Sequence, residues 1–338
     1  MLAIVVALLI ILLLAGVLLW AGGGKTLHEP HGSGIVETVP GALETSPAPA
    51  EELSILSYNI AYGLGDTTSL PADAVTVYDR LDHIIETIAA CGADLVLLQE
   101  VDFASRRTHG VDQLQYIAAA LGWGFVARVI TWECRYLPLP LWPPRHHAGR
   151  LRAGQGVISR YPLVQNTRQR LSQATTQPLL TPLFAPYRIA QMVDVQCSQR
   201  PLRVINVHLE PGDIPTRQRQ AHELAAFARQ VATPNSVLMG TFNGVIAAAT
   251  PSHDQTMEVI TSSLRDRLRL VPDSLPTYPA DEPRDRLDHV FVGPGLQVLE
   301  TRVIALEAPS AAHLPLLVRL RWTLPLAPPN GSHTHANA

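Results

Sequence analysis

The feature that most limits how this chain can fold is an apolar run at its beginning. Residues 2–20, nineteen in all, include no charged and no strongly polar side chain. As an α-helix this run would span about 28 Å, close to the hydrocarbon thickness of a bilayer. A cleavable export signal normally has a basic start and a shorter apolar core, and no Lys or Arg precedes the run. We therefore expect residues 1–21 to form a single-pass transmembrane anchor, with an export signal as the alternative.

The residues that follow predict a tether between the membrane and a folded body. Residues 22–52 are rich in Gly, Pro, Ser and acidic side chains and lack a sustained apolar period, which is typical of a flexible linker. Lys25 is the only basic residue near the apolar run, so charge gives little information on orientation, and we expect an extracytoplasmic body. The polar stretch 325–338 predicts a disordered tail.

Residues 53–324 read as one mixed α and β body. Ten short β-rich runs lie between residues 53 and 322, and amphipathic patterns predict helices over residues 78–91, 111–121 and 216–231. This pattern favours two packed sheets covered by helices. The net charge of −3 gives no global field that would attract a polyanion, and three widely spaced cysteines exclude a disulfide scaffold.

Polar side chains recur where these apolar runs begin or end. One such residue at a strand end is usually a cap or a surface residue, but six of them next to a buried core need partners. If neighbouring strands bring these ends to one rim, the residues define a polar pocket. They are Asn59, Glu100, His208, Asn243, Asp288 and His313.

The surrounding motifs resemble those of the endonuclease/exonuclease/phosphatase superfamily, which has the DNase I-like fold. The resemblance rests on SYNIAYG at 57–63, DLVLLQEVD at 94–102, GQGVISRYPL at 154–163, INVHLE at 205–210, GTFNG at 240–244, PTYPADEPRDRLDHVFV at 276–292 and AHLPLL at 312–317. It implies an α+β fold, a four-layer αββα sandwich, here preceded by the transmembrane helix. It also implies a Mg²⁺-dependent hydrolase of phosphate esters, with Mn²⁺ as a second cation.

The resemblance assigns roles to matching positions. Glu100 would bind the metal, supported by Asn59, since hard oxygen ligands suit Mg²⁺. Asn59, Asn243 and Arg188 would contact the substrate. His208 would stabilise or protonate the leaving oxygen. The remaining catalytic positions are Asn243 at the phosphoryl oxygens, Asp288 orienting a histidine or contacting the metal, and His313 handling the attacking water.

Two departures from the family pattern bear on activity. Thr241 stands where the family has the aspartate of GDFN, and Ala312 stands where it has the aspartate of SDH. At neutral pH a threonine hydroxyl cannot act as an anionic base or a charged metal ligand. We expect a membrane-anchored, phosphodiesterase-like hydrolase. The alternative is a catalytically degenerate member that binds a phosphate ligand or serves as a scaffold.

An Arg-rich stretch at residues 128–170 carries eight arginines and one acid, Glu133, and includes LPLPLWPPRHH at 137–147. Arginines could bind phosphates there while the aromatic residues touch lipid or stack on bases. The alternative is a solvated loop whose arginines pair with acids elsewhere. The anchor favours a membrane-proximal phosphate ester as partner over nucleic acid, and the sequence predicts no oligomeric state.

Overall fold

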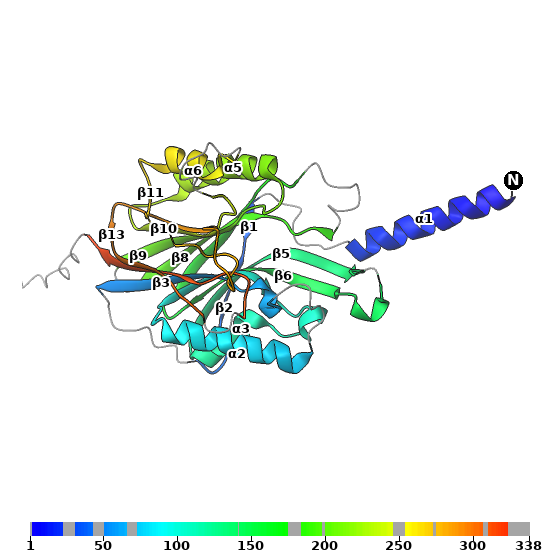
Figure 1. Ribbon diagram of the computed structural model, residues 1–338, viewed down its shortest axis with the longest axis horizontal. Coiled ribbons are helices and arrows are strands. Elements are labelled where there is room, and N and C mark those ends of the chain that lie inside the picture. The colour runs from blue at the N-terminus through cyan, green and yellow to red at the C-terminus, as the bar shows by residue number, and fades with distance from the viewer. Residues whose placement is uncertain are drawn as a thin grey trace, which may run out of the picture.

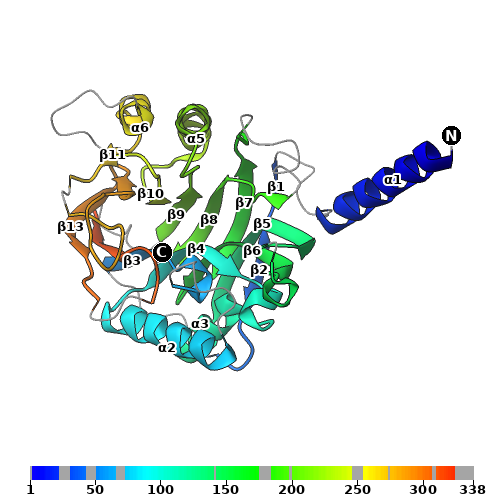
Figure 2. The ribbon, with the colours of Figure 1, turned by 45° about the vertical axis from the view of Figure 1, so that its right-hand side comes forward.

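The structure is a computed structural model in which two mixed sheets pack face to face between two pairs of helices (Figures 1 and 2). The residues that it describes are 2–22, 31–42, 51–65, 73–140, 142–174, 184–197, 200–245, 254–272, 275–306 and 310–323.

The first sheet has seven strands, and those at its centre are almost fully buried. In spatial order they are β1 (His31–Ser33), β7 (Leu163–Arg170), β8 (Ile189–Cys197), β9 (Arg200–His208), β10 (Ser236–Thr241), β12 (Asp288–Val292) and β11 (Arg269–Leu270). β9 and β10 run parallel, whereas β12 runs antiparallel to β10.

The second sheet also has seven strands. In spatial order they are β13 (Leu296–Val303), β14 (Leu316–Trp322), β3 (Glu52–Asn59), β4 (Leu95–Asp102), β6 (Gly149–Ser159), β5 (Phe125–Leu137) and β2 (Ile35–Thr38). β3 and β4 run parallel, and β5 and β6 form a long antiparallel hairpin.

Three apolar clusters hold the four layers together. One lies between the sheets, one joins the second sheet to α2 (Ala74–Ala90) and α3 (Gln113–Leu121), and one joins the first sheet to α5 (Ile214–Val231) and α6 (Thr256–Leu264). α2 and α5 start where Asp73 and Asp213 accept hydrogen bonds from backbone amides of the first helical turn. The expected αββα sandwich is confirmed.

Short 3₁₀ turns complete the connections: η1 (Ala61–Gly63), η3 (Arg106–Thr108) and η4 (Pro144–His146). A layer of buried amides also joins the sheets next to the candidate site. Gln99 of β4 donates to Asn206 Oδ1 of β9 at 2.7 Å, and Asn206 donates back to the carbonyl of Leu98 at 3.1 Å. These bonds fix the register of the two sheets relative to each other, because buried amides need partners.

The N-terminal helix α1 (Leu2–Gly22) is the one described helix that is long and apolar enough to cross a membrane. Its apolar side chains from Ile4 to Leu14 are exposed, so the helix is not part of the core of the body. Figure 1 shows it projecting away from the sandwich.

The tether predicted over residues 22–52 needs a correction. Within it, β1 pairs with β7 in the first sheet and β2 pairs with β5 in the second, so residues 31–38 belong to the sandwich. Backbone pairing at two exposed sheet edges orders this segment despite its polar sequence. The predicted tail at 325–338 lies outside the described residues.

The Arg-rich stretch at 128–170 is not a loop. It forms most of the β5–β6 hairpin and the whole of β7. Arg128, Arg152 and Arg160 pair with acids, as expected for a structural role. The ion pairs among the described residues do not include Arg135, Arg145 or Arg150, which lie towards the hairpin tip.

Candidate functional site

The fold brings the ends of several strands to one rim. β3 and β4 run in the same direction, with Asn59 paired to Gln99, the neighbour of Glu100. β9 and β10 also run in the same direction, with His208 paired to Thr241 at their ends. The ends of parallel strands share one edge of a sheet. The second sheet therefore places Asn59 and Glu100 at its rim, and the first sheet places His208 and Thr241 at the rim that faces it.

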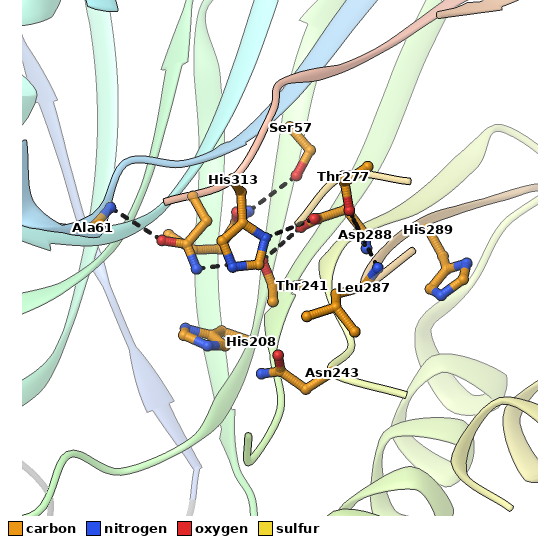
Figure 3. A network of polar contacts seen from close by, with 12 residues as sticks. Ser57, Ala61, His208, Thr241, Asn243, Thr277, Leu287, Asp288, His289 and His313 are labelled. Carbon is orange, nitrogen blue, oxygen red and sulfur yellow. Dashed lines mark hydrogen bonds and ion pairs between the residues drawn. The ribbon is translucent and has the colours of Figure 1, made fainter. Parts of the chain in front are cut away.

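Asp288 and His313 form a buried pair at this rim (Figure 3). Asp288 begins β12, directly opposite Thr241 at the end of β10. Its Oδ2 lies 2.7 Å from Nδ1 of His313, and its Oδ1 accepts a hydrogen bond of 2.7 Å from the Thr241 hydroxyl. The carboxylate thus fixes the His313 ring and leaves Nε2 available.

The charges of this pair shift both groups towards their ionised forms. Burial alone would raise the pKa of Asp288, but the His313 ring and the hydroxyls of Thr277 and Thr241 hold it below its ordinary value. Burial alone would lower the pKa of His313, but Asp288, with help from Glu100, raises it. An imidazole held beside a carboxylate is suited to accepting a proton near neutral pH.

Asn59 links this pair to Glu100. Its Nδ2 lies 3.4 Å from Oε1 of Glu100 and 3.5 Å from the Thr241 hydroxyl, while its Oδ1 accepts a hydrogen bond from the Ala61 amide. Thr241 therefore bridges Asn59 and Asp288. It occupies a position where an aspartate would place a second carboxylate against Asp288.

The backbone at Glu100 is left-handed, with φ of 54°, at a break in the pairing between β4 and β6. Such a bulge re-aims a side chain that would otherwise alternate with its neighbours. Asn243 has the same unusual φ of 54°, just beyond β10. Non-glycine residues in this region cost about 1–3 kcal/mol and cluster at functional sites.

His208 faces Glu100 and is neutral. Burial, followed by the charges of Arg188 and His313, holds the pKa of His208 well below its ordinary value. Its Nδ1 lies 3.1 Å from Nη1 of Arg188, and a guanidinium can only donate, so Nδ1 accepts and Nε2 carries the proton. Nε2 lies 3.7 Å from Oε1 of Glu100. His208 thus presents an N–H group to the site.

Arg188 and Asn243 lie beside this histidine. Arg188, whose Nε is 3.7 Å from Oε2 of Glu210, lines a narrow hollow with Glu100, His208 and Tyr62. Asn243 donates one Nδ2 hydrogen to the carbonyl of Leu209 at 2.8 Å, which leaves its second hydrogen free to reach an anion. Figure 3 shows Asn243 and His208 close together.

The oxygen ligands at the rim fit the expected Mg²⁺ only in an open mode of binding. Among the described residues, no group of three or more His, Cys, Asp or Glu side chains could hold a metal ion. Mg²⁺ is nevertheless often held by one or two carboxylates, with waters and substrate phosphates as its other ligands. Glu100, partly exposed and using only Oε1 for the contacts described above, fits that open mode of binding, with the Asn59 amide beside it.

The structure also resolves the departure at Ala312. Ala312 cannot support the His313 ring, and Asp288, which the resemblance gave the role of orienting a histidine or contacting the metal, lies against that ring. Sequence reasoning missed two further residues of the site. The Thr277 hydroxyl accepts hydrogen bonds from the amides of Leu287 and Asp288, and the Tyr278 ring lies 4.9 Å from the His313 ring. Both lie in the PTYPADEPRDRLDHVFV motif, which was the available signal.

Large cavities do not mark this site. Two hollows of about 750 and 740 Å³ lie elsewhere; they are lined by residues of β11, β13 and β2 with their neighbours, and by no residue of the polar cluster. The polar residues identify the site, and cavity size does not.

A family model for the endonuclease/exonuclease/phosphatase family matches residues 56–318 of this chain. The chain belongs to this family. The matched range includes every strand end that contributes to the polar rim, from Asn59 to His313. The comparison with curated proteins found no match.

Several solved structures share the fold. An endonuclease/exonuclease/phosphatase from Beutenbergia cavernae is 23% identical, with a TM-score of 0.61 over 80% of this chain and 72% of that one. The human Nocturnin catalytic domain with bound sulfate is 18% identical, with a TM-score of 0.53 over 86% and 97%. A mannosyl-6-phosphatase from Bacteroides thetaiotaomicron is 16% identical, with a TM-score of 0.52 over 80% and 100%.

Proposed function

We propose that this protein is a metal-dependent hydrolase of phosphate esters that α1 anchors to a membrane. One observation carries the proposal. The His313–Asp288 pair, Thr241, Asn59, Glu100 and His208 form one connected series of contacts at a single rim. A proton acceptor, a carboxylate and an N–H donor are thereby placed together.

The reaction uses these groups in complementary roles. Neutral His313 accepts a proton from the attacking water at Nε2, and Asp288 stabilises the imidazolium that results. The water oxygen forms the new P–O bond and the ester P–O bond breaks; the leaving oxygen takes its proton from solvent water, and the His313 imidazolium afterwards returns its proton to solvent. His208 donates a hydrogen bond from Nε2, and Arg188 and Asn243 bind the anionic oxygens.

A bound Mg²⁺ or Mn²⁺ supplies positive charge at the phosphate and a template for the attacking and leaving oxygens. Glu100 and Asn59 are the residues that would hold it. Thr241 leaves this part of the site with one carboxylate fewer than the family pattern, so we expect weak binding of the cation and slow turnover.

The experiment is an assay of the full-length protein in nanodiscs. Bis-p-nitrophenyl phosphate and p-nitrophenyl phosphate are tested as soluble diester and monoester, with Mg²⁺, Mn²⁺ or EDTA. Glu100→Gln removes the proposed ligand, and Glu300→Gln is a matched control at a half-exposed ion pair of the distant strand β13. We expect turnover with either cation, lost in Glu100→Gln and in EDTA but kept in Glu300→Gln. Equal rates in wild type and Glu100→Gln would refute the proposal.

Thr241 in place of a carboxylate favours a second candidate function, a phosphate-binding protein without activity. In that case inorganic phosphate or a nucleotide would raise the melting temperature of wild type, no ester would be cleaved, and Arg188→Gln would abolish the thermal shift. Turnover above the Glu100→Gln background excludes this alternative.

The membrane anchor has its own tests. An uncleaved α1 predicts an intact N-terminus by mass spectrometry and retention in the membrane after carbonate washing. An extracytoplasmic body predicts that protease added outside spheroplasts digests it. A mature chain that starts after residue 22 would show a cleaved export signal instead.

A further inference from the structure

The end of α1 is fixed against one particular part of the body. Nη1 of Arg135 on β5 lies 3.5 Å from the carbonyl oxygen of Trp20, and the guanidinium lies 5.9 Å from the centre of the Trp20 ring. Ala21 is buried against the body. Figures 1 and 2 both show α1 leaving the molecule beside the free end of the β5–β6 hairpin. If α1 spans a bilayer, this hairpin lies at its surface.

The connection from α1 to the body is also short. Only residues 23–30 lie between α1 and β1, so nine Cα steps separate Gly22 from His31. Fully extended, they reach roughly 30 Å. The first sheet therefore cannot move far from the membrane, even without the Arg135 contact.

The hairpin extends past the candidate site in the direction of α1. β4 pairs with β6 as far as Asp102, which lies opposite Ala153, whereas β5 and β6 remain paired up to Leu137 and Gly149. Glu100 precedes Asp102 on β4. The ladder thus continues for four residues of β6 beyond the level of the site, about 13 Å. The rim and the hairpin tip point the same way.

The tip carries apolar and basic side chains suited to a membrane interface. Leu139 is 49% exposed and Trp142 is 80% exposed. The exposed arginines Arg135, Arg145 and Arg150 flank them in the sequence, and no acidic residue occurs between Glu133 and Asp194. Tryptophan suits the level of the lipid head groups, and arginines near a surface attract anionic lipids.

The tip is held in shape before any contact is made. Cys134, Leu137, Ala148 and Leu151 form a small apolar cluster between the two strands. The Ala148 amide donates to the carbonyl of Leu139 at 2.8 Å, and the Tyr136 hydroxyl lies 2.6 Å from Nδ1 of His147. Since this scaffold orders the tip, contact with a bilayer costs little conformational entropy.

We propose that the tip of the β5–β6 hairpin, residues 138–140 and 142–148, docks into the same bilayer that α1 spans. Leu139 and Trp142 enter the interface, and Arg135, Arg145 and Arg150 bind anionic head groups. The rim with Glu100 and His208 then faces the membrane. Resting on the proposed function, this orientation makes a phosphate ester in a lipid head group the substrate class.

Docking is measured on the full-length protein in nanodiscs that hold one copy each. Trp142→Cys carries a nitroxide spin label, and because the three native cysteines are free but buried, labelling is selective. Accessibility to oxygen and to a water-soluble nickel chelate reports the depth of the label. Val164→Cys is the matched control, because Val164 is 66% exposed and lies near the start of β7, at the opposite end of β6 from the tip.

We expect the label at position 142 to be protected from the nickel chelate, more strongly in discs that contain phosphatidylglycerol than in pure phosphatidylcholine. The label at position 164 stays water-accessible in both. Equal exposure of the two labels to water would overturn the proposal. Protection that appears only when several copies share one vesicle would also overturn it, because a second copy would then cover the tip.

The substrate class is tested with Trp142→Asp. We expect cleavage of a phospholipid with a fluorescent head group to fall by at least about tenfold, the factor for losing burial of one large apolar side chain. Hydrolysis of bis-p-nitrophenyl phosphate stays unchanged, which shows that the variant is folded. Equal losses on both esters, or no loss on either, would overturn the lipid assignment. If wild type cleaves neither ester, the proposed function fails while the depth measurement still decides docking.

Discussion

The Nδ1 atom of His313 lies 2.7 Å from Oδ2 of Asp288, and both side chains are buried. Asp288 starts β12 in one sheet, whereas His313 precedes β14 in the other. The pair therefore joins the two halves of the sandwich at its rim, and its geometry depends on both sheets.

The first prediction concerns the pH dependence of turnover. Because Asp288 raises the pKa of His313, neutral His313 accumulates only as the pH rises above the ordinary value of 6.5. We expect the rate to increase with pH through a midpoint above 6.5 in wild type. In Asp288→Asn no carboxylate opposes the lowering of the His313 pKa by burial, so the midpoint moves to lower pH. The maximal rate falls about 10²- to 10⁴-fold. Turnover of a soluble ester across pH 5–9 is the measurement, and an unmoved midpoint would show that another group titrates.

The second prediction concerns Thr241. An aspartate at this fully buried position would face Asp288 across the 2.7 Å hydrogen bond that the hydroxyl now donates. We expect Thr241→Asp to lose about 3 kcal/mol of unfolding free energy in EDTA, because two carboxylates repel each other there.

Mg²⁺ should restore that loss in Thr241→Asp and raise turnover, because the cation balances the added charge. Thr241→Asn has a similar shape without the charge, and Mg²⁺ should raise its melting temperature less than that of Thr241→Asp, because the added carboxylate is missing. Thermal unfolding with and without Mg²⁺ compares the two variants. A matching Mg²⁺ response in both would mean that the cation binds elsewhere.

The third prediction concerns His208 and acid stability. The folded protein keeps His208 neutral, whereas the unfolded chain takes up a proton near the ordinary pKa of 6.5. The contribution of His208 to the free energy of unfolding is therefore full above pH 6.5. It decreases as the pH falls, by up to about 1.4 kcal/mol per pH unit. Urea unfolding of full-length protein at pH 7.5, 6.5 and 5.5 should show a smaller acid loss in His208→Gln. Parallel losses in the two proteins would contradict a neutral His208.

The fourth prediction concerns the glycine that precedes Thr241. Gly240 has φ of +147°, and a Cβ there would lie 2.1 Å from the carbonyl oxygen of Val207. We expect Gly240→Ala to destabilise the fold by more than about 3 kcal/mol, because backbone atoms of a central strand must move.

Gly122 provides the comparison for Gly240. It has φ of +69°, and a Cβ there would meet nothing within 4 Å. Gly122→Ala should therefore cost only about 1 kcal/mol, the backbone penalty alone. Similar melting temperatures for the two variants would argue against the close packing of β9 on β10.

The sequence predicted the site residues because each closes or opens a strongly apolar strand. The resemblance implied that Asp288 orients a histidine or contacts the metal, but the sequence could not show that it lies against His313, since that contact joins residues 25 positions apart across the two sheets. Arg188 entered through the family resemblance alone. Its approach to His208, which sets the tautomer, follows from the side-by-side placement of β8 and β9.

Most strands of the body were predictable for the same reason, and the exceptions are polar or very short. β1 has the sequence HGS and β2 the sequence IVET, and neither carries an apolar signal long enough to predict a strand. They form because the edges of both sheets offer unpaired backbone groups. The buried contact between Gln99 and Asn206 was likewise not predicted, because the two residues lie on strands of different sheets and nothing in the sequence of β4 or β9 pairs them.

The left-handed backbone at Glu100 and Asn243 has a consequence for engineering this enzyme candidate. Glycine adopts that conformation without strain, so replacing either residue by glycine relieves local tension while removing a group on which the chemistry depends. A library selected for heat resistance alone would drift towards such changes. Selection on thermal stability would then enrich stable variants that lack Glu100 or Asn243. Only a second screen, for turnover, would retain the active variants.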